Sequence, residues 1–236
     1  MIGRVLVGFV ISSAIAGLAY RRGALSSSGA VAATAVGAVI FIGGGAWWFG
    51  ALGAFFVTST LLGRVGAAFK ARTKREFSKG DTRDAWQVLA NGGVAAVAAL
   101  LMLTAPDARW LYAFVGALAT ANGDTWATEL GILARGEPRS IVTGRRVPRG
   151  TSGAVSALGL GATVAGAFVI GLVAASASGR PLRVLWIAVV AGTVGALVDS
   201  LAGATVRRRS IAAAARASAS RRATTAAPTP SGAAAS

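Results

Sequence analysis

Long apolar runs separated by short polar loops are the feature that most constrains how this chain can fold. A helix needs about 20 predominantly apolar residues to cross a bilayer. Seven runs reach or approach that length, at residues 2–20, 30–42, 47–62, 85–104, 110 onward, 156–177 and 182–206. Of the 236 residues, 54% are hydrophobic and only 14% are charged. We therefore expect an all-α fold, a polytopic membrane helix bundle of about seven transmembrane helices over residues 1–206.

The basic residues predict which ends of these helices face the cytoplasm, because cytoplasmic loops carry an excess of Lys and Arg. An outside N-terminus places the loops at 63–84 and 135–150 and the tail at 207–236 in the cytoplasm. Of the 24 Lys and Arg residues, only the four at positions 4, 109, 180 and 183 then lie outside. We expect a cytoplasmic C-terminus in the cell membrane, a disordered basic tail, contact with membrane lipid, and no nucleic acid.

The chain has no Cys and no His. Their absence excludes disulfides, thiolate metal sites, cysteine nucleophiles and an imidazole base. Any chemistry must therefore use Asp, Glu, Asn, Ser, Thr, Lys and Arg.

A polar island interrupts the fifth apolar run, with two acids, Asp124 and Glu129, in the sequence Ala-Asn-Gly-Asp-Thr-Trp-Ala-Thr-Glu. A carboxylate at the bilayer centre costs about 2.5 to 3.5 kcal/mol on insertion scales. Such acids usually face a cavity, a partner or a ligand. The island is therefore the first candidate for a functional site.

Other unusual polar residues approach the same membrane face in the predicted topology. Asp84, Gln87 and Asn91 recur at helical spacing at the start of the fourth span, and Asp199 lies near the end of the last one. The loop at 146–153 also lies on that face. This convergence favours a site, although hydrogen bonds between helices, or basic loops that bind anionic lipid, would explain the same residues.

The side chains available there suit phosphate chemistry. Carboxylate and amide oxygens are the ligands that Mg²⁺ prefers, usually shared with substrate phosphates. A glycine-rich turn from Gly150 to Gly153 offers backbone N–H groups to an anion, although Thr151 or Ser152 could equally be an ordinary helix N-cap. Metal, cations and an N–H cradle are the parts that phosphoryl transfer needs.

Helical geometry separates the two acids of the island. On a continuous helix Asp124 lies roughly 140° from Glu129. Either Gly123 breaks the helix, or the two acids serve different partners. Asp124 is the favoured metal ligand, while Glu129 is either a third ligand or the partner of a loop cation such as Arg135.

Four separated motifs resemble one known family, that of plant phytyl-phosphate kinase and transmembrane protein 19. They are Gln-Val-Leu-Ala-Asn-Gly-Gly at 87–93, Asn-Gly-Asp-Thr-Trp-Ala-Thr-Glu at 122–129, Val-Pro-Arg-Gly-Thr-Ser-Gly at 147–153 and Asp-Ser-Leu-Ala-Gly-Ala at 199–204. The resemblance implies an integral membrane kinase that converts a prenyl monophosphate, such as phytyl or geranylgeranyl phosphate, to the diphosphate with a nucleoside triphosphate, CTP in the first place. It also implies kinship with polyprenol kinases and CDP-diacylglycerol synthases.

The expected site combines residues from all four motifs and the two basic loops. Asp124, Asn91 and Asn122 form the expected catalytic group, and Asp124, Asp199 and Glu129 the expected Mg²⁺ ligands. The expected phosphate-binding residues are Lys79, Arg83, Gln87, Arg146, Gly150, Thr151, Ser152 and Gly153. The alternative is a membrane transporter or flippase for an anionic lipid phosphate; a homodimer is compatible with either function.

Overall fold

Helices make up nearly all of the folded chain. The computed structural model describes residues 2–67, 69–70, 82–176 and 178–225, from 206 on as backbone only. The elements are α1 (Ile2–Arg21), α2 (Ser27–Arg64), α4 (Ala85–Thr104), α5 (Ala108–Gly131), β1 (Arg139–Ser140), β2 (Ala154–Val155), α6 (Ala157–Ala175) and α7 (Pro181–Thr225). The two short strands pair antiparallel within the segment that joins α5 to α6.

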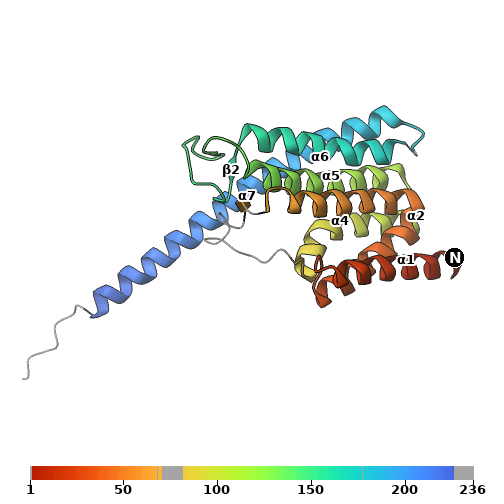
Figure 1. Cartoon of the computed structure of the whole chain (residues 1–236), viewed down its shortest axis with the longest axis horizontal. Coiled ribbons are helices and arrows are strands. Elements are labelled where there is room, and N and C mark those ends of the chain that lie inside the picture. The colour runs from red at the N-terminus through yellow and green to blue at the C-terminus, as the bar shows by residue number, and fades with distance from the viewer. Residues whose placement is uncertain (1, 68, 71–81, 177, 226–236) are drawn as a thin grey trace, which may run out of the picture.

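Helix α2 consists of two arms that meet at Gly45. Gly45 has φ 77° and ψ −166°, a backbone conformation that interrupts the helix and that glycine adopts without strain. The rings of Phe41 and Phe49, on either side of it, pack edge to face at 5.7 Å. Residues eight apart in a straight helix are separated by about 12 Å along its axis, so the chain folds back here (Figure 1). The interruption between the apolar runs at 30–42 and 47–62 therefore lies at Gly45.

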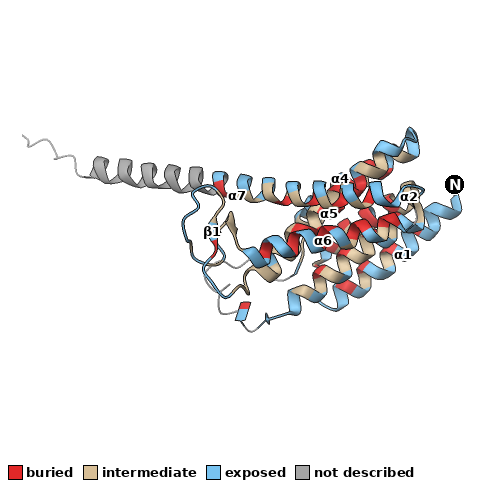
Figure 2. Cartoon of the chain, turned by 90° about the horizontal axis from the view of Figure 1, so that it is seen from above, coloured by how far each residue is buried: buried red, intermediate tan, exposed pale blue. Residues whose placement is uncertain are grey.

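Helix α5 lies at the centre of the bundle, in contact with α2, α4, α6 and α7. Its residues Phe114, Val115 and Leu118 are fully buried, and the Phe114 ring stacks on Trp48 of α2 at 4.3 Å between centroids. Figure 2 shows the buried residues gathered between the helices. Because neighbouring helices surround α5, its polar residues can face protein and cavities instead of lipid.

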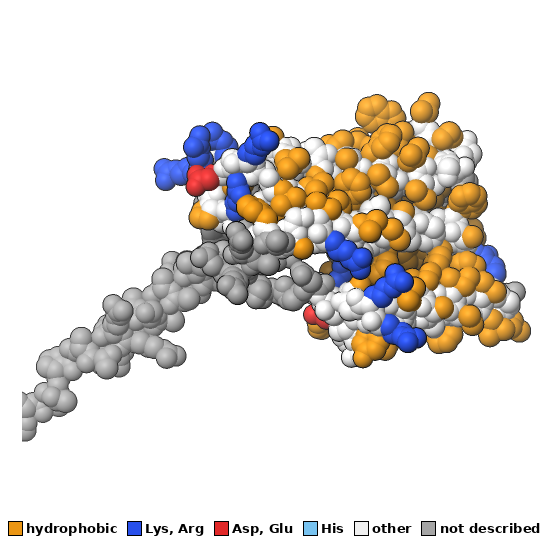
Figure 3. Space-filling model, in the orientation of Figure 1, with side chains coloured by type: hydrophobic (Ala, Val, Ile, Leu, Met, Phe, Trp, Pro, Cys, Tyr) orange, Lys and Arg blue, Asp and Glu red, His pale blue; other side chains and the backbone are white. Residues whose placement is uncertain are grey.

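The outer surface of the bundle is apolar over the length of its helices, as the visible face in Figure 3 shows. Five helices are long and apolar enough to cross a membrane: α1, α2, α4, α6 and α7 up to Thr205. Helix α5 is not among them, because Asn122, Asp124 and Glu129 reduce its hydropathy. The prediction of a helical bundle with several helices able to span a membrane is therefore confirmed.

The end of the chain differs from the prediction. Helix α7 continues to Thr225, whereas a disordered tail is predicted from 207. The reason is local composition: residues 211–225 are rich in Ala, the strongest helix former, and contain no Pro. Residues 226–236 lie outside the described residues.

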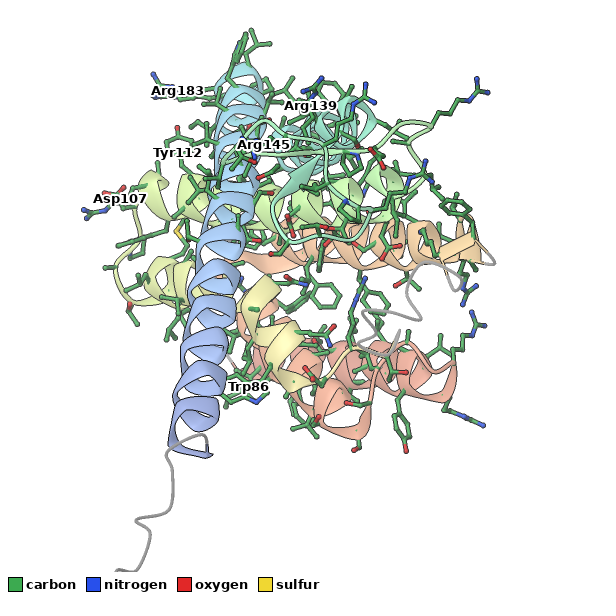
Figure 4. The ribbon with its side chains drawn as sticks, turned by 90° about the vertical axis from the view of Figure 1, so that its left-hand side faces the viewer. Trp86, Asp107, Tyr112, Arg139, Arg145 and Arg183 are labelled. Atoms are coloured by element: carbon green, nitrogen blue, oxygen red, sulfur yellow. The ribbon has the colours of Figure 1, made fainter. Side chains whose placement is uncertain are left out.

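The interhelical loops that carry the polar motifs lie at one end of the bundle (Figure 1). The backbone of Arg83, just before α4, pairs with residues 24 and 26, just after α1. At the same end, Gly66 lies against Leu133, which follows α5. Figure 4 looks onto this end: Arg139 and Arg145 lie in the segment between α5 and α6, and Trp86 lies at the start of α4. The predicted convergence of the polar motifs therefore has a structural basis.

Candidate functional site

A cavity of about 290 Å³ lies between α5, α6, α7 and the segment 132–156. We call it the loop cavity. Its wall includes Asp124 of α5, Asp199 and Ser200 of α7, Arg149, and the turn at 150–153. Arg149 is the one basic side chain among the described residues that line it. Acidic, cationic and backbone groups thus face one small volume.

The turn at 150–153 is built by two glycines with positive φ, 81° at Gly150 and 74° at Gly153. The backbone N–H and hydroxyl of Thr151 both donate to Pro148 O, at 3.2 and 2.7 Å. The turn sits directly on α7, since a Cβ added at Gly153 would lie only 2.9 Å from Ser200 O. The third and fourth predicted motifs are therefore in direct contact.

The turn leaves hydrogen-bond donors free. In the part of the chain that the structure describes, no hydrogen bond uses the backbone N–H of Ser152 or Gly153, or the Ser152 hydroxyl. The N-cap of α6 is Ser156, whose hydroxyl accepts from Gly159 N at 3.1 Å. Neither Thr151 nor Ser152 is therefore a helix cap, and unpaired N–H groups in a turn of this kind suit an anion.

The two carboxylates of the loop cavity also lack partners. Within the described residues, neither Asp124 nor Asp199 has a hydrogen bond or an ion pair. Two like charges beside one cavity repel each other, and a cation between them removes that cost. Their oxygens, with the hydroxyls of Ser152 and Ser200 in the same wall, form an all-oxygen donor set that fits Mg²⁺.

Glu129, the third predicted metal ligand, lies apart from this pair. It forms an ion pair with Lys70 Nζ at 2.5 Å, and the Lys70 side chain is only 3% exposed. Helix α5 runs unbroken through Gly123 to Gly131, and only Asp124 of the two acids of the island lines the loop cavity. No group of three acidic side chains in the described ranges is close enough to hold a metal; the three predicted ligands do not form one cluster.

A second cavity, of about 610 Å³, lies on the other side of Asp124 and is called the groove below. Its wall includes Arg83, Gln87 and Asn91, together with Glu129 and Arg64. Asp124 and Thr128 line both the groove and the loop cavity. The first predicted motif therefore meets the second across the groove, and Asp124 stands where the two cavities adjoin.

Arg83 is held firmly at the groove. Its backbone donates to Ala24 O at 3.1 Å and accepts from Ser26 N at 3.0 Å. Its guanidinium lies 5.8 and 5.9 Å from the ring centres of Phe55 and Phe56. Burial lowers the pKa of this guanidinium, and the nearby charge of Glu129 opposes that shift. Since Arg83 has no ion-pair partner among the described residues, it is a desolvated cation available to an anion.

Asn122, predicted as a catalytic residue, is used in helix packing. It is fully buried. Its Oδ1 accepts from the hydroxyls of Thr58 and Ser59 at 3.2 and 3.4 Å, and its Nδ2 donates to Gly166 O at 2.8 Å. These bonds join α5 to α2 and α6. Asn122 lines neither the loop cavity nor the groove.

Of the predicted basic residues, only some line a cavity. Arg83 lines the groove, Arg146 is exposed and lines neither cavity, and Lys79 lies outside the described residues. Arg149 was not predicted, yet it lines the loop cavity, with its guanidinium 5.3 Å from the Phe69 ring centre and bonded to Arg135 O at 3.1 Å. Its position next to Gly150, inside the third motif, is the signal that could have found it.

Comparison with known proteins identifies the family. The integral membrane protein family DUF92 matches residues 10–234. Protein PGR of Arabidopsis thaliana is 36% identical over 230 residues, which cover 86% of this chain and 79% of the plant protein. An uncharacterized membrane protein of Methanocaldococcus jannaschii is 31% identical, covering 88% of this chain and 85% of its own. No solved structure matches. The family membership predicted from the four motifs is confirmed: the chain belongs to the DUF92 family of integral membrane proteins.

Proposed function

We propose that this protein is a membrane prenyl-phosphate kinase. It transfers the γ-phosphate of a nucleoside triphosphate, CTP in the first place, to a prenyl monophosphate such as phytyl or geranylgeranyl phosphate. The observation that carries this proposal is the adjacency of the loop cavity and the groove, which share Asp124 and Thr128. Arg149 lines the loop cavity, and Arg22, Arg64 and Arg83 line the groove, so two phosphate-bearing molecules can approach each other at Asp124. The resemblance of the motifs around both cavities to the phytyl-phosphate kinase family supports the same reaction.

The loop cavity is the proposed donor side. Arg149 and the free N–H groups of Ser152 and Gly153 bind the nucleotide phosphates, because charge-assisted and backbone N–H bonds are the usual means of holding phosphate. Asp124 and Asp199 are the residues that would hold Mg²⁺. When bound, this ion supplies neutralisation of the phosphate charge that grows during transfer.

The groove is the proposed acceptor side. Arg83 binds the monophosphate, and Gln87 and Asn91, which line the groove beside it, orient its oxygens. A phosphate monoester oxygen attacks the γ-phosphorus as the bond between the β–γ bridging oxygen and the γ-phosphorus breaks, giving a prenyl diphosphate and a nucleoside diphosphate. The nucleophile is already deprotonated near neutral pH, so the step needs no base. Catalysis then consists of positioning and electrostatic stabilisation.

The proposal includes a topology of seven crossings. The two arms of α2 on either side of Gly45 count as two spans, and the central helix α5 counts as one, shielded from lipid by its neighbours. With the N-terminus outside, the loop end with most of the Lys and Arg residues faces the cytoplasm. The site would then open to the compartment that supplies nucleotide, in the cell membrane.

The direct test uses purified protein in lipid nanodiscs with Mg²⁺. Phytyl, farnesyl and geranylgeranyl monophosphates are each combined with ATP, CTP, GTP and UTP, and diphosphate is measured by mass spectrometry. At least one combination should give diphosphate, with Gly136→Ala, in the same loop but away from both cavities, as an active control. If no combination gives diphosphate, while wild type but not Asp124→Asn moves a prenyl phosphate across liposomes, transport replaces transfer as the function.

A further inference from the structure

A third cavity, of about 170 Å³, opens beside the groove between α1, the two arms of α2 and α4. We call it the apolar cavity. Its wall is almost entirely hydrophobic and includes Ile15, Phe49, Phe55, Phe56 and Val88.

Three polar residues join the apolar cavity to the groove. Arg83, Gln87 and Asn91 line both volumes. The Arg83 guanidinium lies over the rings of Phe55 and Phe56, which belong to the apolar wall. A cation at the mouth of an apolar cavity matches an amphipathic anion, whose charged head stays in the groove while its tail is buried.

We infer that the apolar cavity binds the head-proximal part of the hydrocarbon tail of a single-chain lipid phosphate, with Arg83 on its phosphate. This inference rests on the proposed function for the identity of the lipid as phosphate acceptor. A single chain is inferred because the cavity is small, about 170 Å³, and its polar residues Arg83, Gln87 and Asn91 are those that it shares with the groove. The rest of the tail lies in the bilayer along α1 and α4, whose outward residues, among them Val5, Phe9, Val94 and Val97, are apolar and exposed.

Gly53 offers a way to narrow the cavity without disturbing the fold. It lies in the second arm of α2 and lines the apolar cavity. A Cβ added there meets no heavy atom within 4 Å, and a helix gains about 1 kcal/mol when Gly is replaced by a better helix former. Gly50, one turn earlier, is equally open but lines none of the three cavities. Gly53→Leu and Gly50→Leu are therefore a matched pair.

The experiment measures equilibrium binding of labelled lipids to the full-length protein in mild detergent, without nucleotide. The probes are geranylgeranyl monophosphate, the shorter geranyl monophosphate and uncharged geranylgeraniol. Gly53→Leu should weaken binding of the long monophosphate about tenfold or more and change that of the short one less, while Gly50→Leu binds all three as wild type does. Arg83→Gln should weaken both monophosphates about tenfold but leave the alcohol unchanged.

Equal affinity of wild type and Gly53→Leu for the long monophosphate overturns the inference, as does an equal loss in Gly50→Leu. An Arg83→Gln protein that loses the alcohol together with the monophosphates also contradicts it. These outcomes are separable from the proposed function. If the lipids bind with the expected variant pattern but no phosphate is transferred, the tail site stands and the kinase function is wrong. If phosphate is transferred but Gly53→Leu has no effect on lipid binding, the kinase function stands and the tail site is wrong.

Discussion

The acidic side chains of α5 differ in whether they have an ion-pair partner. On the loop side, Asp124 faces Asp199 across a cavity, and neither has a partner among the described residues. On the side of the 65–70 segment, Glu129 is neutralised by a buried lysine. An unpaired, partly buried carboxylate lowers the stability of the fold. When a buried carboxylate is paired, removing either partner of the ion pair lowers the stability. In the proposed function, Asp124 and Asp199 therefore hold the metal ion, whereas Glu129 attaches a loop to α5.

The largest expected effect is the loss of stability when Glu129 becomes Gln. Lys70 would then be a buried charge without its counter-ion, which costs about 3 to 5 kcal/mol. The measurement is the thermal unfolding midpoint in detergent. Lys70→Met combined with Glu129→Gln removes the orphaned charge and should recover much of the loss. A Glu129→Gln protein as stable as wild type would remove the structural role assigned to this side.

Asp124→Asn should produce the opposite pattern. Loss of this carboxylate should lower the rate of diphosphate formation about 10²- to 10³-fold, the usual size for one electrostatic group at a phosphoryl or oxyanion site. Its unfolding midpoint should stay the same or rise, because no ion pair is broken. Rates are compared at saturating nucleotide and lipid. If the Asp124→Asn protein were destabilised but fully active, Asp124 would have a structural role like that of Glu129, and the contrast between the two acids would be wrong.

Asp199→Asn tests whether the second carboxylate of the loop cavity serves the same ion. Asp199 is more exposed than Asp124, so its removal should raise the Mg²⁺ concentration needed for half-maximal rate by about tenfold, the lower end for groups that support a metal. A titration of rate against Mg²⁺ measures this. An unchanged Mg²⁺ requirement would leave Asp124 without its predicted companion.

Asp107→Asn is expected to have the smallest effect and serves as the exposed reference. Asp107 caps α5 by accepting from Arg109 N at 2.8 Å, and its ion pair with Arg109, at 3.4 Å, is open to solvent. Asn keeps the cap, and exposed ion pairs contribute about 0 to 1 kcal/mol. Both the activity and the unfolding midpoint should match those of wild type. A large change in either would show that the exposure of an acidic residue does not determine how much its removal affects the protein.

The membrane bundle and the meeting of the four motifs could be predicted from the sequence, because apolar runs and basic loops report on each helix separately. Contacts between distant residues could not. Asn122 is a packing residue only because Thr58, Ser59 and Gly166 surround it. The Lys70–Glu129 pair joins residues 59 apart in the sequence.

Arg149 and the end of α7 show two further limits. Three arginines are close together at 145–149, and the prediction chose Arg146, although Arg149, inside the third motif and next to Gly150, is the one that lines the loop cavity. In α7, the Ala-rich composition extends the helix past the basic residues at 207–209, where polarity and charge predict disorder. Local propensity outweighs composition there.

Phosphate transfer to the prenyl acceptor can be followed with a γ-³²P nucleoside triphosphate in nanodiscs that contain the protein, Mg²⁺ and a prenyl monophosphate. Wild type should place the label in the terminal phosphate of a prenyl diphosphate, and Asp124→Asn should place at least about a hundredfold less there. Label that stays on the nucleotide, or that appears only as inorganic phosphate, for every nucleotide and acceptor would contradict it.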